Sequence, residues 1–304
     1  MIAVRSGVEC RLFSEGGEAA DPMAEIPSFL GCCQVGEQVH VFVSYSAFTE
    51  DYLLHGAELA PCPQQLPAPV LLAHGSSQDA WVLTPRSILL LSPARGELPL
   101  PFAAELAAAD EQYVVCASRG DVAVLAVEEG EVKVLCRYTT EYDVGCVEVK
   151  ASAEGCVVLL GEWVTNCLHV LTVAAGRVVR VVKKEMQSAI VSLLVTDVPA
   201  DTHTDGRADT RADTRVETRF VVVSESDGTV VVLRACGTSL TTTSAPADAD
   251  SEWVEEKQLR ASRLPLQWVR TRDPALVVGV GEKSCMLYYK NKNWLYGVWA
   301  GSDA

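Results

Sequence analysis

A chain of 304 residues with a formal net charge of −15 is long enough for one large β domain or two ordinary domains. Hydrophobic residues make up 49% of the chain, so it can bury a substantial core, and its acidity disfavours non-specific binding to the phosphate backbone of nucleic acids. No apolar run reaches membrane-spanning length, and no secretory leader is visible.

One local pattern recurs along the chain: a short apolar run, a tight polar turn with Gly or Asp, and a second apolar run. Weaker copies begin near Ile2, Phe29 and Ala80, and the clearest copies begin at Tyr113, Val157, Phe220 and Ala275. The runs are short and rich in Val and Leu, which favours strands over helices. A β-hairpin that recurs at the spacing of blades is typical of a β-propeller, in which one blade takes about 40–60 residues. We therefore predict an all-β chain, a WD40-like β-propeller segment over residues 1–304, with an incomplete ring of four to six blades.

Several segments interrupt this pattern. The Pro-rich stretch Pro61–Pro69 is expected to be an extended connector, and Pro99–Asp110, with its alanines, to make a short helical turn. Within Asp201–Arg219, acids and arginines each recur every four residues, which on a helix would stack like charges. We predict disordered insertions at residues 199–219 and 238–252. A short interaction tail is the alternative for the first of them.

The cysteines and histidines do not form a recognisable metal motif. There are eleven cysteines, most of them inside apolar runs where a thiol behaves as a small hydrophobe, and no Cys-x-x-Cys occurs. Unpaired thiols favour a reducing compartment, the nucleus or cytosol. None of the five histidines stands in metal-ligand spacing with another, and His40 and His169 are expected to be ordinary strand residues.

The sequence also lacks the signatures of common catalytic sites. It contains no Gly-x-Ser-x-Gly elbow, phosphate-binding loop or dinucleotide fingerprint. Adjacent carboxylates such as Glu255 and Glu256 point to opposite faces of a strand, so they do not form an acid–base pair. We predict no catalytic, cofactor-binding or metal-binding residues, no cofactor and no enzymatic activity. A propeller enzyme, the alternative, needs titratable groups in a central channel, whereas these strands offer mostly Val, Leu and Ala.

The lysine- and aromatic-rich stretch from Lys283 to Trp299 has two interpretations. Interleaved aromatics and lysines can stack bases and neutralise phosphates. The favoured interpretation is a hairpin that turns at Lys290–Asn293, with its aromatics packed between blades. Candidate anchors for a protein partner are Trp81, Trp163, Tyr296 and Trp299, with core packing as the alternative for each.

The order of these features resembles a family of triple-propeller scaffolds. The family comprises the large subunit of the UV-damaged-DNA-binding complex, the third subunit of splicing factor 3b and the largest cleavage and polyadenylation specificity subunit. The similar segments are Gln112–Ala117, Gly120–Val127, Tyr138–Val149, Val158–Leu171, Ser226–Leu233, Lys257–Val269, Ala275–Tyr289 and Trp294–Tyr296. No single motif is diagnostic, and the specificity comes from their order.

The resemblance implies that the chain corresponds to the second propeller of that family. The phrase Gly161-Glu-Trp-Val-Thr is most similar to the damage-binding member, whose second propeller docks the cullin scaffold of a ubiquitin ligase. The expected function is thus a non-enzymatic protein–protein interaction scaffold in a nuclear complex, with the cytoplasm as a second compartment. The expected partners are a cullin-type scaffold or RNA-processing subunits. The alternative is a subunit of the splicing or cleavage and polyadenylation machinery, with nucleic-acid contact only through the complex. No membrane or small-molecule partner is expected.

Overall fold

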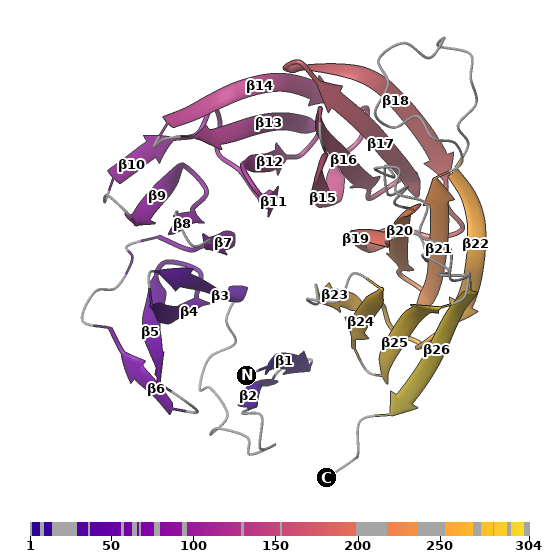
Figure 1. Ribbon diagram of the computed structural model, residues 1–304, viewed down its shortest axis with the longest axis horizontal. Coiled ribbons are helices and arrows are strands. Elements are labelled where there is room, and N and C mark those ends of the chain that lie inside the picture. Colours follow the sequence, from indigo (N-terminus) through magenta and orange to yellow (C-terminus); the bar gives the residue numbers. More distant parts are fainter. Residues whose placement is uncertain are drawn as a thin grey trace, which may run out of the picture. The chain divides into compact units, whose positions relative to one another are not determined.

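In the computed structural model, every regular element of the described residues is a β-strand, and the chain folds as an all-β protein (Figure 1). The described residues are 2–6, 9–13, 29–35, 37–55, 58–62, 66, 68–75, 80–92, 96–128, 131–152, 154–198, 218–235, 253–269, 275–281, 283–290 and 293–300. They contain no helix of the length and apolarity needed to cross a membrane.

After the pair β1–β2, the strands follow one another in groups of four. In the first half of the chain they are β1 (Ile2–Ser6), β2 (Glu9–Phe13), β3 (Phe29–Val35), β4 (Gln38–Ser44), β5 (Thr49–His55), β6 (Glu58–Pro61), β7 (Leu72–Gly75), β8 (Ala80–Leu83), β9 (Ser87–Ser92), β10 (Gly96–Pro99), β11 (Leu106–Asp110), β12 (Tyr113–Ser118), β13 (Asp121–Glu128) and β14 (Glu131–Thr139). In the second half they are β15 (Val144–Ser152), β16 (Gly155–Glu162), β17 (Cys167–Ala174), β18 (Arg177–Glu185), β19 (Ile190–Val198), β20 (Thr218–Glu225), β21 (Thr229–Ala235), β22 (Trp253–Arg260), β23 (Gln267–Val269), β24 (Leu276–Val280), β25 (Lys283–Lys290) and β26 (Asn293–Ala300).

Consecutive strands pair as meanders, giving six four-stranded antiparallel sheets and the two-stranded pair β1–β2 among the described residues. This confirms the all-β prediction and is consistent with a β-propeller-like fold. The chain divides into two compact units, Met1–Ala151 (unit 1) and Ser152–Ala304 (unit 2), and the division falls near the end of β15. Sheets β3–β6, β7–β10 and β11–β14 lie in unit 1, and sheets β19–β22 and β23–β26 lie in unit 2.

Within each unit, successive sheets contact one another through their first or second strands. In unit 1, the first strand β7 contacts the first strands β3 and β11, and in unit 2, the first strand β19 contacts the second strand β16 and the first strand β23. The second and third strands are the most buried; every residue of β16 is buried, whereas the fourth strand β18 alternates between exposed and half-buried residues. A strand that is buried on both faces needs apolar residues at every position, which explains why the recurring apolar runs stand out in the sequence.

The sheets pack through apolar side chains of adjacent strands. In unit 2, Phe220 of β20 meets Tyr289 and Trp294 of the last hairpin, with ring centroids 4.8 and 5.2 Å away. These residues belong to a core that also contains Val222, Leu259, Leu266, Val277 and Leu287. In unit 1, sheets β7–β10 and β11–β14 share a core that includes Trp81, Leu83, Ile88, Val114 and Leu125.

Buried polar groups connect neighbouring sheets at equivalent places in the two units. Ser44 Oγ accepts a hydrogen bond from Val70 N at 2.7 Å, and Ser224 Oγ accepts one from Leu266 N at 2.8 Å. In each case a serine at or near the end of a second strand accepts from the backbone just before the next sheet. Such a bond satisfies a buried N–H that would otherwise be unpaired.

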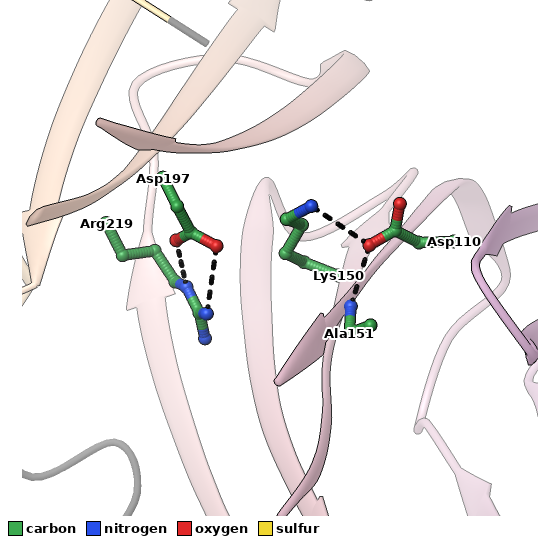
Figure 2. Close-up of polar contacts among 5 residues, drawn as sticks. All are labelled: Asp110, Lys150, Ala151, Asp197 and Arg219. Carbon is green, nitrogen blue, oxygen red and sulfur yellow. Dashed lines mark hydrogen bonds and ion pairs between the residues drawn. The ribbon is translucent and has the colours of Figure 1, made fainter. Parts of the chain in front are cut away.

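A second type of connection joins the first strands of neighbouring sheets. Asp110 of β11 accepts a hydrogen bond from Ala151 N at 2.8 Å and pairs with Lys150 at 3.1 Å (Figure 2). In unit 2, Ser192 of β19 accepts a hydrogen bond from Trp268 N at 3.2 Å. The two contacts use different side chains at different positions along the first strand: Asp110 ends β11, whereas Ser192 lies near the start of β19.

Four sheets also share a closing backbone hydrogen bond, which joins the end of the fourth strand to the start of the third strand. The residue after the fourth strand donates its N–H to the carbonyl of the residue before the third strand. The pairs are Leu100–Arg86, Thr140–Gly120, Met186–Asn166 and Ala261–Gly228. A repeated closure of this kind indicates that the sheets are copies of one structural unit, as the recurring sequence pattern predicts.

The structure differs from the sequence prediction in two segments. The predicted helical turn within Pro99–Asp110 is wrong, because Leu106–Asp110 forms β11 and pairs with β12. The first predicted insertion extends two residues too far: Thr218 and Arg219 begin β20. Arg219 binds Asp197 of β19 through two hydrogen bonds of 2.6 and 3.1 Å (Figure 2). Residues 199–217 and 236–252 lie outside the described residues.

Candidate functional site

One end of unit 2 carries the turns that follow the second and fourth strands of sheets β15–β18 and β19–β22, and we call it the loop end. It consists of residues 163–166, 186–189, 226–228 and 261–266. The turns are bonded to one another: the backbone N–H groups of Gln187 and Ser188 donate to Glu225 Oε1 at 2.8 and 3.1 Å. Leu266 N donates to Ser224 at 2.8 Å. These bonds place the turns of neighbouring sheets at a common end.

Three large apolar side chains are exposed at the loop end. Trp163 is 57% exposed, Val164 66% and Leu264 56%. Trp163 and Val164 occupy the turn between β16 and β17, and Leu264 lies in the connection from β22 to β23. Large apolar side chains that are exposed at one end of a domain are candidates for contact with a partner.

A buried polar cluster lies directly beneath the Trp163 turn. The last residue of β16, Glu162, is buried and accepts a hydrogen bond from the Thr165 hydroxyl through Oε2. Its other oxygen, Oε1, lies 3.2 Å from Nε2 of the buried His169. Burial lowers the pKa of His169, an effect that the nearby Glu162 opposes and Lys183 reinforces. The turn is therefore fixed at its base by side chains that cannot exchange freely with water.

The pairing of β16 with β17 explains why this cluster forms. Leu160 pairs with His169 and Gly161 with Leu168, so Glu162 and Cys167 come next at the end of the hairpin. Since side chains two apart point to the same face, Glu162, Cys167 and His169 share one face. One ligand-type atom from each of the three residues lies within 4.8 Å of the others.

Glu225 has a similar structural role at the next turn. It is the last residue of β20, is fully buried, and holds the Gln187–Ser188 backbone through Oε1. Burial raises the pKa of Glu225, and the two N–H donors partly oppose the rise. Asp227 caps the same turn by accepting from the Thr229 N–H and hydroxyl at 2.9 and 3.0 Å.

Unit 1 contains a second cluster of ligand-type side chains, formed by His40, Asp51 and Cys62. His40 Nδ1 lies 2.9 and 3.0 Å from the two carboxylate oxygens of Asp51, so both groups are engaged with each other. Burial raises the pKa of the Cys62 thiol, and the Asp51 charge adds to the rise. His40 and His169 are strand residues, as predicted, but each belongs to a cluster of this type.

The structure separates the four candidate anchors. Trp81 is buried in the unit 1 core and stacks on His74 with centroids 4.8 Å apart, so it is a core residue. Trp163 is exposed at the loop end. Tyr296, in the edge strand β26, is 56% exposed and has Lys257 Nζ 4.6 Å from its ring centroid. Trp299 lies in β26, and its side chain is outside the described residues.

The lysine- and aromatic-rich stretch forms the predicted hairpin. Lys290 pairs with Asn293, and Tyr289 and Trp294 pack against Phe220 of the neighbouring sheet. The aromatics on this face are thus core residues of unit 2 rather than a free stacking surface. Adjacent Glu255 and Glu256 lie in β22, where Glu256 pairs with Arg234 at 2.8 Å.

Sequence reasoning missed Val164, Leu264 and the buried carboxylates Glu162 and Glu225. Each lies in or beside a turn, and the only signal was the phrase Gly161-Glu-Trp-Val-Thr, in which an apolar pair follows an acid at a strand end. The nine cysteines whose side chains the structure describes are all free thiols, as the sequence predicted. Neither family models nor curated proteins match the chain.

Proposed function

We propose that the chain is a β-propeller segment and acts as a non-enzymatic scaffold that binds other proteins through the loop end of unit 2. The observation that carries the proposal is the exposure of Trp163, Val164 and Leu264 on turns that are bonded to one another. The six four-stranded sheets of the described residues, and the closing hydrogen bond that four of them share, support the propeller architecture.

The mechanism is presentation of apolar anchors on a rigid support. Trp is among the residue types that dominate binding energy at interfaces, especially where it enters a pocket of the partner. The Trp163 turn is held by Glu162, Thr165 and the Met186–Asn166 backbone bond, so little conformational entropy remains to be lost on binding. Rigid anchors of this kind favour affinity without any chemistry by the scaffold itself.

For the identity of the partner, we propose a cullin-type scaffold of a nuclear ubiquitin ligase, with the chain as a damage-binding-type adaptor. The support is the ordered resemblance to triple-propeller scaffolds and the position of the phrase Gly161–Thr165 at the loop end. A subunit of the splicing or cleavage and polyadenylation machinery is the second candidate, favoured by the same ordered resemblance. In both cases the net charge of −15 supports nucleic-acid contact through partners rather than directly.

A direct binding measurement tests the proposal. Purified chain is titrated with a purified cullin scaffold and, separately, with reconstituted splicing and polyadenylation subunits, by isothermal titration calorimetry. We expect Trp163→Ala to weaken binding by at least about tenfold. The matched control is Tyr296→Ala, which removes an equally exposed aromatic from the edge strand β26 and should leave the affinity unchanged.

The outcomes separate the candidates. Binding only to RNA-processing subunits, with the same loss for the Trp163 variant, would replace the ligase assignment by the second candidate. Binding that is equally weakened by both variants, or by neither, would show that the loop end is not the docking surface.

A further inference from the structure

The cluster beneath the Trp163 turn has a donor set that the docking proposal does not use. Glu162 offers a carboxylate oxygen, His169 an imidazole nitrogen and Cys167 a sulfur, and all three come from one tight hairpin. Glu162 and His169 are buried, whereas Cys167 is half-buried. Nitrogen, sulfur and carboxylate oxygen are the ligands that proteins use for zinc and related divalent transition metals.

The distances fit such an ion. Ligand bonds of about 2.0–2.3 Å at tetrahedral angles place neighbouring ligand atoms roughly 3.3–3.8 Å apart. Glu162 Oε1 and His169 Nε2 are 3.2 Å apart, and the Cys167 sulfur lies within 4.8 Å of both groups. The Cys167 sulfur must approach by at most about 1.5 Å for the three atoms to reach these separations.

The surroundings orient the carboxylate without occupying it fully. The Thr165 hydroxyl holds Oε2 of Glu162, and Oε1 makes no hydrogen bond with the described residues. Hydrogen bonds from an outer group to a metal-binding carboxylate are a common feature of metal sites. The neighbouring strand β18 places Glu185 opposite Cys167 and Lys183 opposite His169, so one acid and one base face the cluster from that side.

We propose that Glu162, Cys167 and His169 form a site for one divalent transition-metal ion of the zinc class, with solvent as the fourth ligand. The ion would tie the end of β16 to the start of β17 and fix the turn that carries Trp163 and Val164. The cluster in unit 1 is the weaker candidate, because both Asp51 oxygens lie within 3.0 Å of His40 Nδ1, whereas a single oxygen of Glu162 approaches His169, at 3.2 Å. The proposal is independent of which protein, if any, binds the loop end.

Cobalt(II) is a suitable spectroscopic probe because it binds at zinc sites and gives a sulfur-to-metal charge-transfer absorption band when a thiolate binds it. The full chain is titrated with cobalt(II) and then with zinc in competition. We expect one equivalent to produce this band and zinc to abolish it. Cys167→Ser should remove the band, and Glu162→Gln and His169→Gln should weaken the affinity at least about tenfold.

Two further measurements guard against misinterpretation. The controls Cys62→Ser and Cys136→Ser replace partly buried thiols outside the cluster and should keep the band. In the unmodified chain, zinc should slow the alkylation of Cys167 and leave the alkylation rate of Cys62 unchanged. Peptide mass spectrometry measures both rates. The alkylation test does not depend on whether a variant folds.

The proposal fails if the unmodified chain gives no thiolate–cobalt band at one equivalent. It also fails if the band persists in a folded Cys167→Ser variant, or if zinc leaves the alkylation rate of Cys167 unchanged.

Discussion

Replacing Ser224 by alanine tests whether a single buried hydroxyl holds two sheets of unit 2 together. Ser224 and Leu266 are both fully buried, and Leu266 N donates to the serine oxygen at 2.8 Å. The substitution removes the acceptor and leaves a buried backbone N–H that water cannot reach. Such a loss costs about 1–3 kcal/mol, whereas an ordinary surface substitution stays within about 0.5 kcal/mol. We expect the free energy of unfolding to fall by that larger amount.

Urea denaturation monitored by tryptophan fluorescence is a suitable assay, because five of the six tryptophans (163, 253, 268, 294 and 299) belong to unit 2. The matched control is Ser226→Ala, the same chemical change at an exposed turn position two residues away. If the two variants unfold with the same free energy, the Leu266 N–H has another acceptor in solution and the role given to Ser224 is wrong.

Three further predictions concern the same unit. Phe220→Ala should destabilise the chain by about 3–5 kcal/mol in urea denaturation, because it empties the contact with Tyr289 and Trp294; a loss below about 1 kcal/mol would mean that the two sheets do not pack there. Gly228→Ala should destabilise the chain by at least about 1–2 kcal/mol, because φ of Gly228 is 82° and an added Cβ would overlap the Ser262 carbonyl. Gly297→Ala is the control, because Gly297 has open space around it, and it should show no such loss. Thermal melts of both variants check this prediction. Glu225→Gln should flatten the pH dependence of stability: burial raises the pKa of Glu225 in the folded state, so the stability it contributes is present below the ordinary carboxyl pKa and lost as pH rises through the raised value. Parallel stability–pH profiles for the two proteins in that range would contradict this assignment.

The sequence was most informative where strands are buried on both faces. The clearest copies of the recurring pattern, at Tyr113, Val157, Phe220 and Ala275, coincide with second and third strands, whose positions are almost all apolar. Outer strands such as β18 alternate in burial and carry charges, so they gave little signal. Periodicity therefore revealed the repeat but not the full set of four strands in each sheet.

The errors have physical causes. Ala107, Ala108 and Ala109 favour helix by propensity, but their backbone groups pair with β12, and tertiary pairing overrides such a weak preference. Arg219 ends a low-complexity run, yet register places it opposite Asp197, where it forms two hydrogen bonds. Neither outcome is visible without knowing which strands lie side by side.

The loop end was predictable only in part. Trp163 stood out as a large aromatic beside a turn, and its exposure agrees with an anchor role, whereas Trp81 proved to be a core residue. The cluster of Glu162, Cys167 and His169 depends on the register of β16 with β17, which brings residues on both sides of a turn to one face. The sequence was searched for Cys-x-x-Cys motifs and for pairs of histidines. That search cannot find a set made of one Glu, one Cys and one His, with Glu162 on one side of a hairpin turn and Cys167 and His169 on the other.

The closing backbone bond that four of the sheets share has a practical consequence for engineering the chain. In sheet β19–β22 this bond, from Ala261 to Gly228, lies at the loop end. Residues 199–217 connect β19 to β20 and residues 236–252 connect β21 to β22, and the strand ends that they connect lie at the opposite end of the same sheet. Epitope tags or fluorescent reporters grafted into either segment should leave the turns of the loop end in place, which makes these positions the natural choice for labelling the protein.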